Sequence, residues 1–175
     1  MVSRVVALVS VAVAVVGLAS HVQAQDRTRP IVEAVVGTSG FIDESWDHFP
    51  TTGVSARWFV TPRFAIGPEI TIQRGRNEAS NLTVTGNMSF DLIQEGPGRR
   101  IVPYVVAGGG YLRQRTLVGS GPGSNTLQPF VSAEGTLSGG FGARIAAGPS
   151  FFVAPEFRLG WEPEMRFAMM IGVRP

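Results

Sequence analysis

The chain has 175 residues, with 15 basic and 13 acidic side chains and a formal net charge of +2. The charges are nearly balanced, and the basic residues form no cluster or arm that would neutralise several phosphates. Nucleic acid is therefore not expected as a partner. The sequence contains no cysteine, which excludes disulfides and zinc sites built from thiolates.

The first 24 residues have the layout of a secretory signal peptide. Arg4 precedes an apolar run over residues 5–18, and small or modest side chains follow at residues 22–24. A transmembrane helix is the competing interpretation, but a spanning helix needs about 20 apolar residues, and small and polar residues interrupt this run within that distance. We therefore predict a cleaved signal peptide at 1–24 and an exported domain at 25–175, which is long enough for one sizeable core.

The rest of the chain alternates apolar and polar residues with a period of two, the pattern of β-strands with one apolar face. The separation is nearly complete over residues 64–73, where Ile66, Ile70 and Ile72 alternate with polar or small residues. Residues 53–61 follow the same rule with Phe59 as the one misfit, and residues 101–114 are glycine-rich and ambiguous in phase. Eight strands are predicted, at residues 31–38, 53–61, 64–73, 81–93, 101–114, 137–147, 151–161 and 165–173.

The connections between these segments tend to alternate in length along the chain. Residues 39–52 and 115–136 are expected to be long loops, whereas residues 61–63 and 148–150 are short turns. Outer-membrane barrels have short periplasmic turns and longer outside loops, so this order fits a barrel with both termini in the periplasm. An even number of strands can also close without leaving an edge.

Alternation does not say which face lines the barrel. A soluble lipocalin-like barrel would place Trp58, Phe90, Phe141, Phe157 and Trp161 inside and a heavily charged face outside. The polar face here is instead sparse in charge and rich in small residues. Small residues with a few opposed Arg and Glu suit a crowded polar interior, because eight strands leave little room.

Three stretches carry a family resemblance. Residues 151–159, the preceding glycine-rich residues 139–143 and the final strand running into Gly172 resemble the last hairpins of small OmpA/OmpX-like outer-membrane β-barrel proteins. The resemblance implies an all-β fold, an eight-stranded antiparallel up-and-down transmembrane β-barrel in the bacterial outer membrane. It also implies contact with outer-membrane lipid and with the barrel-assembly machinery during biogenesis, and it leaves the partners of the outside loops open.

Five charged residues form the candidate site. In the hairpin around residues 61–63, Arg57 is placed opposite Gly67 and diagonal to Glu69; in the hairpin around Pro149, Glu156 is placed opposite Gly142 and diagonal to Arg144. With Arg158 two residues further along, the set predicts an ion-pair network in the lumen. Such a network could plug or gate a pore, or could only satisfy charges in a structural interior. The residues of this site are Arg57, Glu69, Arg144, Glu156 and Arg158.

His48 supports a different, weaker hypothesis. It is the one histidine after the signal peptide and lies in the first long loop near Ser45, a setting that resembles outer-membrane lipid acyltransferases and deacylases. A nucleophile needs a base within hydrogen-bond reach, yet nothing else in the sequence supports this motif. Asp43 and Asp47 with one histidine lack the fixed geometry of a metal site, so we expect no catalytic residues, no metal and no cofactor.

The sequence therefore favours a non-enzymatic outer-membrane β-barrel with a structural, adhesive or narrow-pore role. Two alternatives stay open at this stage. One is a soluble periplasmic lipocalin-like barrel that binds an apolar ligand, and the other is an outer-membrane lipid-modifying enzyme that uses His48.

Overall fold

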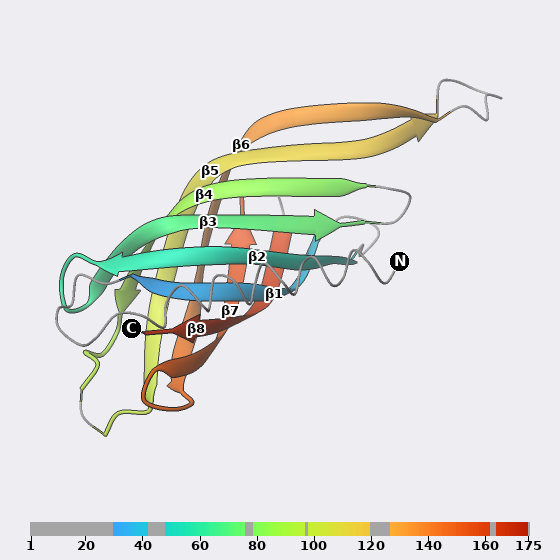
Figure 1. The fold of residues 1–175 in the computed structure, drawn as a ribbon. Coiled ribbons are helices and arrows are strands. Elements are labelled where there is room, and N and C mark those ends of the chain that lie inside the picture. Colours follow the sequence, from blue (N-terminus) through green and yellow to red (C-terminus); the bar gives the residue numbers. More distant parts are fainter. Residues whose placement is uncertain are drawn as a thin grey trace.

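The computed structural model describes residues 30–41, 48–75, 79–96, 98–119, 127–161 and 164–174, without the side chains of residues 41, 48, 117–119 and 127. The predicted signal peptide at 1–24 lies outside the described residues. The described part forms a closed antiparallel barrel in which each strand pairs with the next and β8 pairs with β1 (Figure 1). The strands are β1 (Ile31–Phe41), β2 (His48–Phe59), β3 (Phe64–Arg74), β4 (Ser80–Asp91), β5 (Ile101–Gly119), β6 (Leu127–Ala146), β7 (Phe151–Gly160) and β8 (Glu164–Val173).

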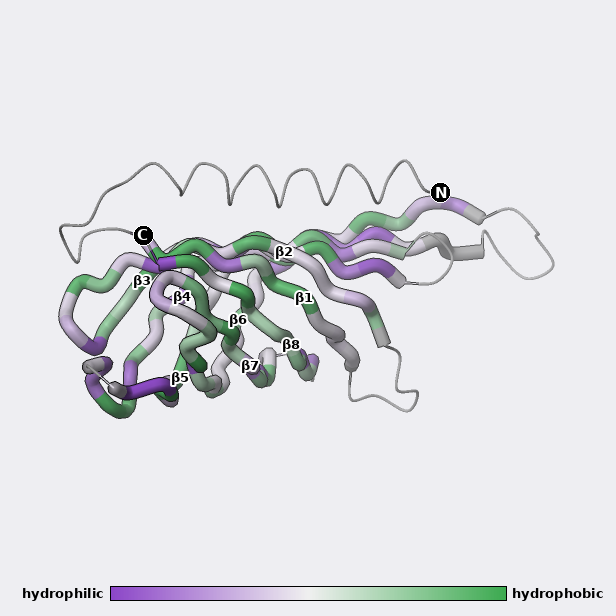
Figure 2. The backbone as a smooth tube through the Cα atoms, turned by 60° about the horizontal axis from the view of Figure 1, so that its bottom comes forward, coloured by the Kyte–Doolittle hydropathy of each residue, from purple (hydrophilic) through white to green (hydrophobic). Residues whose placement is uncertain are grey.

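Most large apolar side chains of the strands point outward, and most polar ones point into the lumen. Figure 2 shows the resulting alternation of hydrophobic and hydrophilic residues along the strands. Phe141 and Trp161 expose 61% and 82% of their surface, whereas Glu69, Thr71 and Gln73 on the other face of β3 are buried. A soluble barrel would reverse this arrangement, so the lipocalin-like alternative is wrong. In the described part of the chain, no helix has the length and apolarity needed to cross a membrane.

The two turns that fix register behave as predicted. Across the turn after β2, Val60 N–H donates to the Phe64 carbonyl at 2.9 Å, and Ser55 lies opposite Glu69, the register that places Arg57 beside Gly67. Across the turn after β6, Gly142 pairs with Glu156. A slip of one residue in either hairpin would turn every side chain of a strand to the opposite face.

The predicted lengths of the two long loops are wrong, because the strands extend into both of them. Residues 39–41 and 48–52 belong to β1 and β2, and residues 115–119 and 127–136 belong to β5 and β6. Alternation fails as a signal there because apolar and polar residues do not separate between the two faces: Leu117 and Val118, and Phe130 and Val131, are consecutive apolar residues. Pairing with the neighbouring strand extends them beyond the apolar band, most of all in the β5–β6 hairpin, which projects past the other strands in Figure 1.

An apolar cluster fills the lumen at the end of the barrel where β1 begins and β8 ends. Tyr104, Phe152 and Met170 are its largest fully buried members. Phe59 packs against this cluster, which explains why it breaks the alternation of β2: its ring turns into the lumen. In β5 the same cluster settles the ambiguous phase, because Val102, Tyr104 and Val106 point inward.

Candidate functional site

The inward faces of the strands bring charged residues together in the middle of the barrel. Among the described residues, four acidic side chains and four arginines are buried. Their formal charges therefore sum to zero. The eight residues come from β1, β2, β3, β4, β6, β7 and β8. These residues are Glu33, Glu69, Asp91, Glu156, Arg57, Arg144, Arg158 and Arg166.

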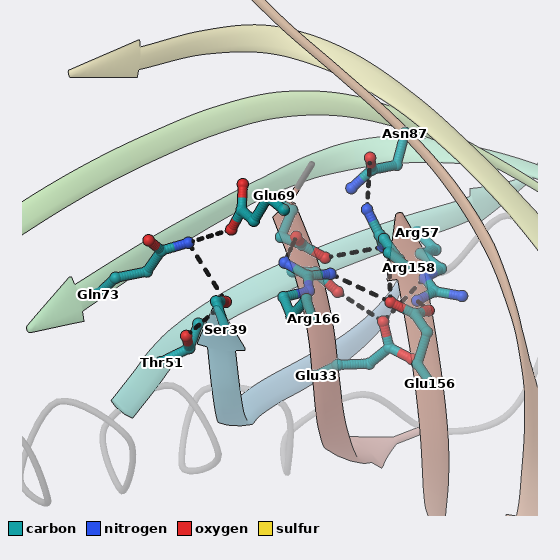
Figure 3. Close-up of polar contacts among 12 residues, drawn as sticks. Glu33, Ser39, Thr51, Arg57, Glu69, Gln73, Asn87, Glu156, Arg158 and Arg166 are labelled. Carbon is teal, nitrogen blue, oxygen red and sulfur yellow. Dashed lines mark hydrogen bonds and ion pairs between the residues drawn. The ribbon is translucent and has the colours of Figure 1, made fainter. Parts of the chain in front are cut away.

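Glu156 of β7 is the hub of the arrangement (Figure 3). Its Oε2 lies 3.1 Å from Arg57 Nη2, and its Oε1 lies 2.7 Å from Arg158 Nε and 3.1 Å from Arg166 Nη2. The Tyr104 hydroxyl donates to Oε2 at 2.8 Å. One carboxylate thus holds side chains from β2, β5, β7 and β8.

Two further carboxylates extend the network from this hub. Glu69 of β3 lies 3.1 Å from Arg158 Nη2 and 2.6 Å from Arg166 Nη1. Glu33 of β1 lies 2.9 Å from Arg57 Nε and accepts a hydrogen bond from Ser55 Oγ at 2.5 Å. We call Glu33, Arg57, Glu69, Glu156, Arg158 and Arg166 the lumen network.

A second, smaller cluster lies beside it. Arg144 of β6 is fully buried and pairs with Asp91 of β4. Its guanidinium carbon lies 5.2 Å from the centre of the Phe59 ring and 5.1 Å from that of Tyr104. An arginine held between two aromatic rings is stabilised by cation–π attraction as well as by its ion pair.

The network leaves little space in the lumen. A cavity of about 30 Å³ lies beside Glu69, Arg158 and Arg166, which is room for about two water molecules. The carboxylates of the lumen network are engaged by guanidinium groups. What it can do is bind the strands to one another across the barrel and obstruct the passage of ions.

All five residues predicted for the site are buried in the lumen, and four belong to the lumen network. Neither predicted diagonal contact is the one that forms. Arg57 pairs with Glu33 and Glu156 rather than Glu69, and Arg144 pairs with Asp91 rather than Glu156. Glu33 lies diagonal to Arg57 on the neighbouring strand β1. The pairs Arg57–Glu156 and Arg144–Asp91 instead join strands that are not neighbours, because long inward side chains reach across a narrow lumen.

Sequence reasoning missed three members of the two clusters. Asp91 and Arg166 lie on the polar faces of clearly alternating segments. They would have been found if every charged residue on a polar face had been considered as a possible ion-pair partner. Glu33 had no such signal, because both faces of its short segment are largely apolar. The hypothesis on His48 stays a prediction, since its side chain and Ser45 lie outside the description; the backbone of His48 pairs with Gly40.

No protein-family model matches the chain, and no curated protein matches it. Solved structures do. Neisserial surface protein A (NspA) aligns at 10% identity with a TM-score of 0.64, covering 87% of this chain and 100% of that one. The N-terminal β-barrel domain of Pseudomonas aeruginosa OprF aligns at 14% identity with a TM-score of 0.56, covering 83% of this chain and 97% of that one.

A third similar structure is Ail, the attachment invasion locus protein of Yersinia pestis. It aligns at 12% identity with a TM-score of 0.53, covering 82% of this chain and 93% of that one. Identities this low establish the shared fold alone. The predicted fold, an eight-stranded transmembrane β-barrel of the small outer-membrane type, is confirmed.

Proposed function

We propose that this chain, which has the fold of a small eight-stranded outer-membrane β-barrel, is a sealed anchor in the bacterial outer membrane that presents its β5–β6 hairpin for adhesive contacts. In this proposal the signal peptide is cleaved on export, and the barrel-assembly machinery inserts the domain. The short turns after β2 and β6 face the periplasm, as do both termini, so the hairpin faces outward.

The observation that carries the proposal is an open edge on β6. Pairing between β6 and β7 begins at Ser138 and Gly160, and Trp161 N–H donates to the Leu137 carbonyl. Among the described residues, nothing pairs with residues 127–136 on that side, although β5 pairs with them on the other. Ten residues correspond to about 33 Å of strand. An exposed edge of this length is a template for an added strand.

The side chains of the hairpin suit a contact surface. Phe130 and Val131 are 57% and 47% exposed on neighbouring positions of β6, so they face opposite sides of the hairpin. A partner strand added to this edge would gain main-chain hydrogen bonds from the edge and side-chain contacts on either side. The name of the similar protein Ail, an attachment invasion locus protein, supports an adhesive role.

We predict that Ala133→Pro abolishes binding of extended chains to the hairpin. The Leu137 carbonyl points toward β7, where it accepts a hydrogen bond. Residue 133 is four positions earlier in the same strand, so its N–H points to the same side, which is the open edge. Proline removes that donor without disturbing the pairing with β5. The measurement is binding of a reduced, carboxymethylated globular protein, whose chain stays extended, to the immobilised barrel. Ala133→Val keeps the N–H and should bind like the original chain. Equal binding by the native, folded form of the probe would contradict the proposal.

A sealed lumen predicts electrical silence. The full-length barrel should give no steady conductance in planar bilayers, because the lumen network is compact and neutral. Arg166→Ala removes two ion pairs and leaves Glu69 and Glu156 with excess negative charge, so we expect small, cation-selective currents. Arg113→Ala, on the outer face of β5, should stay silent. Steady currents through the original barrel would favour the narrow-pore role instead.

A further inference from the structure

A row of three amide side chains crosses the inward face of the barrel wall, at the end from which the β5–β6 hairpin projects. Gln73 of β3 pairs with Asn81 of β4, and Asn81 pairs with Gln114 of β5. Each has the same parity as the buried residues of its strand, so all three side chains lie on the lumen side. Neighbouring strands are about 4.8 Å apart, so the amides start side by side. We call these three residues the amide row.

A hollow of about 350 Å³ lies against the amide row. This volume is in the range of small-ligand pockets. The ring of Phe49 on β2 also lines the hollow, together with the small residues Gly75 and Ala79. The ring lies close against β3, because a Cβ at Gly75 would be 2.6 Å from Phe49 Cε1. The hollow therefore has an aromatic wall on β2 and amide groups on β3, β4 and β5.

Gln73 is the fixed member of the amide row. Its Nε2 donates to Glu164 Oε1 at 2.6 Å and to Ser39 Oγ at 3.3 Å, and its Oε1 accepts from Asn81 Nδ2 at 3.0 Å. It lines both this hollow and the small cavity beside the lumen network, so it lies between the two. A wall held in place in this way loses little conformational entropy when a ligand binds.

The other two amides keep hydrogen-bonding capacity for a ligand. Asn81 uses one N–H group on Gln73, which leaves its second N–H and its oxygen. Within the described part of the chain, no hydrogen bond engages the Gln114 amide. Both side chains are half-buried and line the hollow. Amides offer donors and acceptors together, and so do hydroxyl groups. A ligand rich in hydroxyl groups therefore matches both amides.

The aromatic wall narrows this chemistry to a sugar. Carbon-bound hydrogens on the flat face of a pyranose carry partial positive charge, whereas the face of an aromatic ring carries partial negative charge. Among the described residues that line the hollow, the one charged side chain is that of Arg115. It starts from the outward face of β5 and is exposed. The inward lining is uncharged, which favours a neutral ligand.

We propose that the hollow binds a neutral sugar, a pyranose unit with equatorial hydroxyl groups at the end of a glycan. The flat face of the sugar lies against the Phe49 ring, and its hydroxyl groups bond to the amides of Asn81 and Gln114. The inference relies on the proposed orientation only for access to glycans outside the cell. It does not depend on the open edge of β6.

The test is a saturation-transfer NMR titration of the full-length barrel in a phosphocholine detergent, whose headgroup contains no sugar. The probe is cellobiose, a neutral β-linked glucose disaccharide. Gln114→Ala removes the unengaged amide and should weaken binding about tenfold. Gln94→Ala removes an exposed amide at the opposite end of the barrel and should bind within about twofold of the original. Heat-modifiable gel mobility shows that each variant is folded.

The aromatic wall has its own pair of variants. Phe49→Leu keeps an apolar side chain but removes the ring, so cellobiose should bind about fivefold more weakly. Phe151→Leu makes the same change at an exposed position of β7 at the opposite end and should bind like the original. Sorbitol has hydroxyl groups but no ring, so it should bind at least about tenfold more weakly than cellobiose.

Arg115→Gln separates a neutral ligand from an anion, since it should leave cellobiose binding within about twofold of the original. The proposal is overturned if the original barrel shows no saturable binding of cellobiose, if Gln114→Ala or Phe49→Leu binds as well as the original, or if sorbitol matches cellobiose. A loss in Arg115→Gln as large as that in Gln114→Ala would overturn it as well. The Ala133 variants test the adhesive role separately, because residue 133 does not line the hollow.

Discussion

Glu156→Ala is expected to lower the free energy of unfolding by about 3–5 kcal/mol, the usual cost of removing one partner from a buried ion pair. The Glu156 carboxylate forms ion pairs with Arg57, Arg158 and Arg166 and accepts a hydrogen bond from the Tyr104 hydroxyl. Without it, three arginines stay buried with only Glu33 and Glu69 to compensate them. Their mutual repulsion acts between strands on opposite sides of the lumen, so the loss should loosen the whole barrel.

Urea unfolding in detergent micelles, followed by tryptophan fluorescence, measures this effect. The matched control is Glu134→Ala: Glu134 also points inward on β6 but is only half-buried, and its removal should change the unfolding free energy by less than about 1 kcal/mol. Equal losses in the two variants would show that Glu156 is not the hub of the network.

Gly67→Ala is expected to prevent the barrel from closing normally. A Cβ at this inward position of β3 would lie 1.8 Å from the Ala56 carbonyl oxygen on β2. The obstructing atom is backbone, so relief requires the two strands to move apart beside Arg57. Overpacking costs about 1–3 kcal/mol and occasionally more. Because backbone has to move here, we expect a loss at the upper end of that range and a disturbed register in the hairpin.

Folding yield and heat-modifiable gel migration report the outcome. Gly86→Ala on the neighbouring strand is the control, because nothing lies within 4 Å of the position its Cβ would take. That variant should fold at least as well as the original, since alanine restricts the unfolded chain more than glycine does. Normal folding of Gly67→Ala would mean that β2 and β3 do not approach as closely as described.

The neutrality of the lumen connects these predictions to function. An anchor that must not leak benefits from an interior in which every charge is countered within the protein, whereas a pore needs unpaired polar surface along an open path. The lumen network supports the first arrangement, and the open edge of β6 places the proposed contact surface outside the lumen. Edge and lumen can be varied independently.

Much of this architecture could be predicted from the sequence. Nearly complete alternation over residues 64–73 and alternation over residues 155–161 predicted which side chains share a face, and the three-residue turns around Pro62 and Pro149 predicted the register of two hairpins. Both are local properties, since a side chain's face depends on parity along the strand and a tight turn admits few registers. The inward position of all five predicted site residues followed from them.

Only the closed barrel decided the rest. Which arginine meets which carboxylate depends on the width of the lumen and on β8 returning to β1. Arg166 of β8 meets Glu69 of β3, and Arg57 of β2 meets Glu156 of β7, through contacts that no neighbouring-strand rule contains. The length of the β5–β6 hairpin likewise comes from pairing between two strands whose own residues alternate weakly. Parity along a strand is encoded locally, whereas contacts across the lumen and the extent of pairing arise only when distant strands come together.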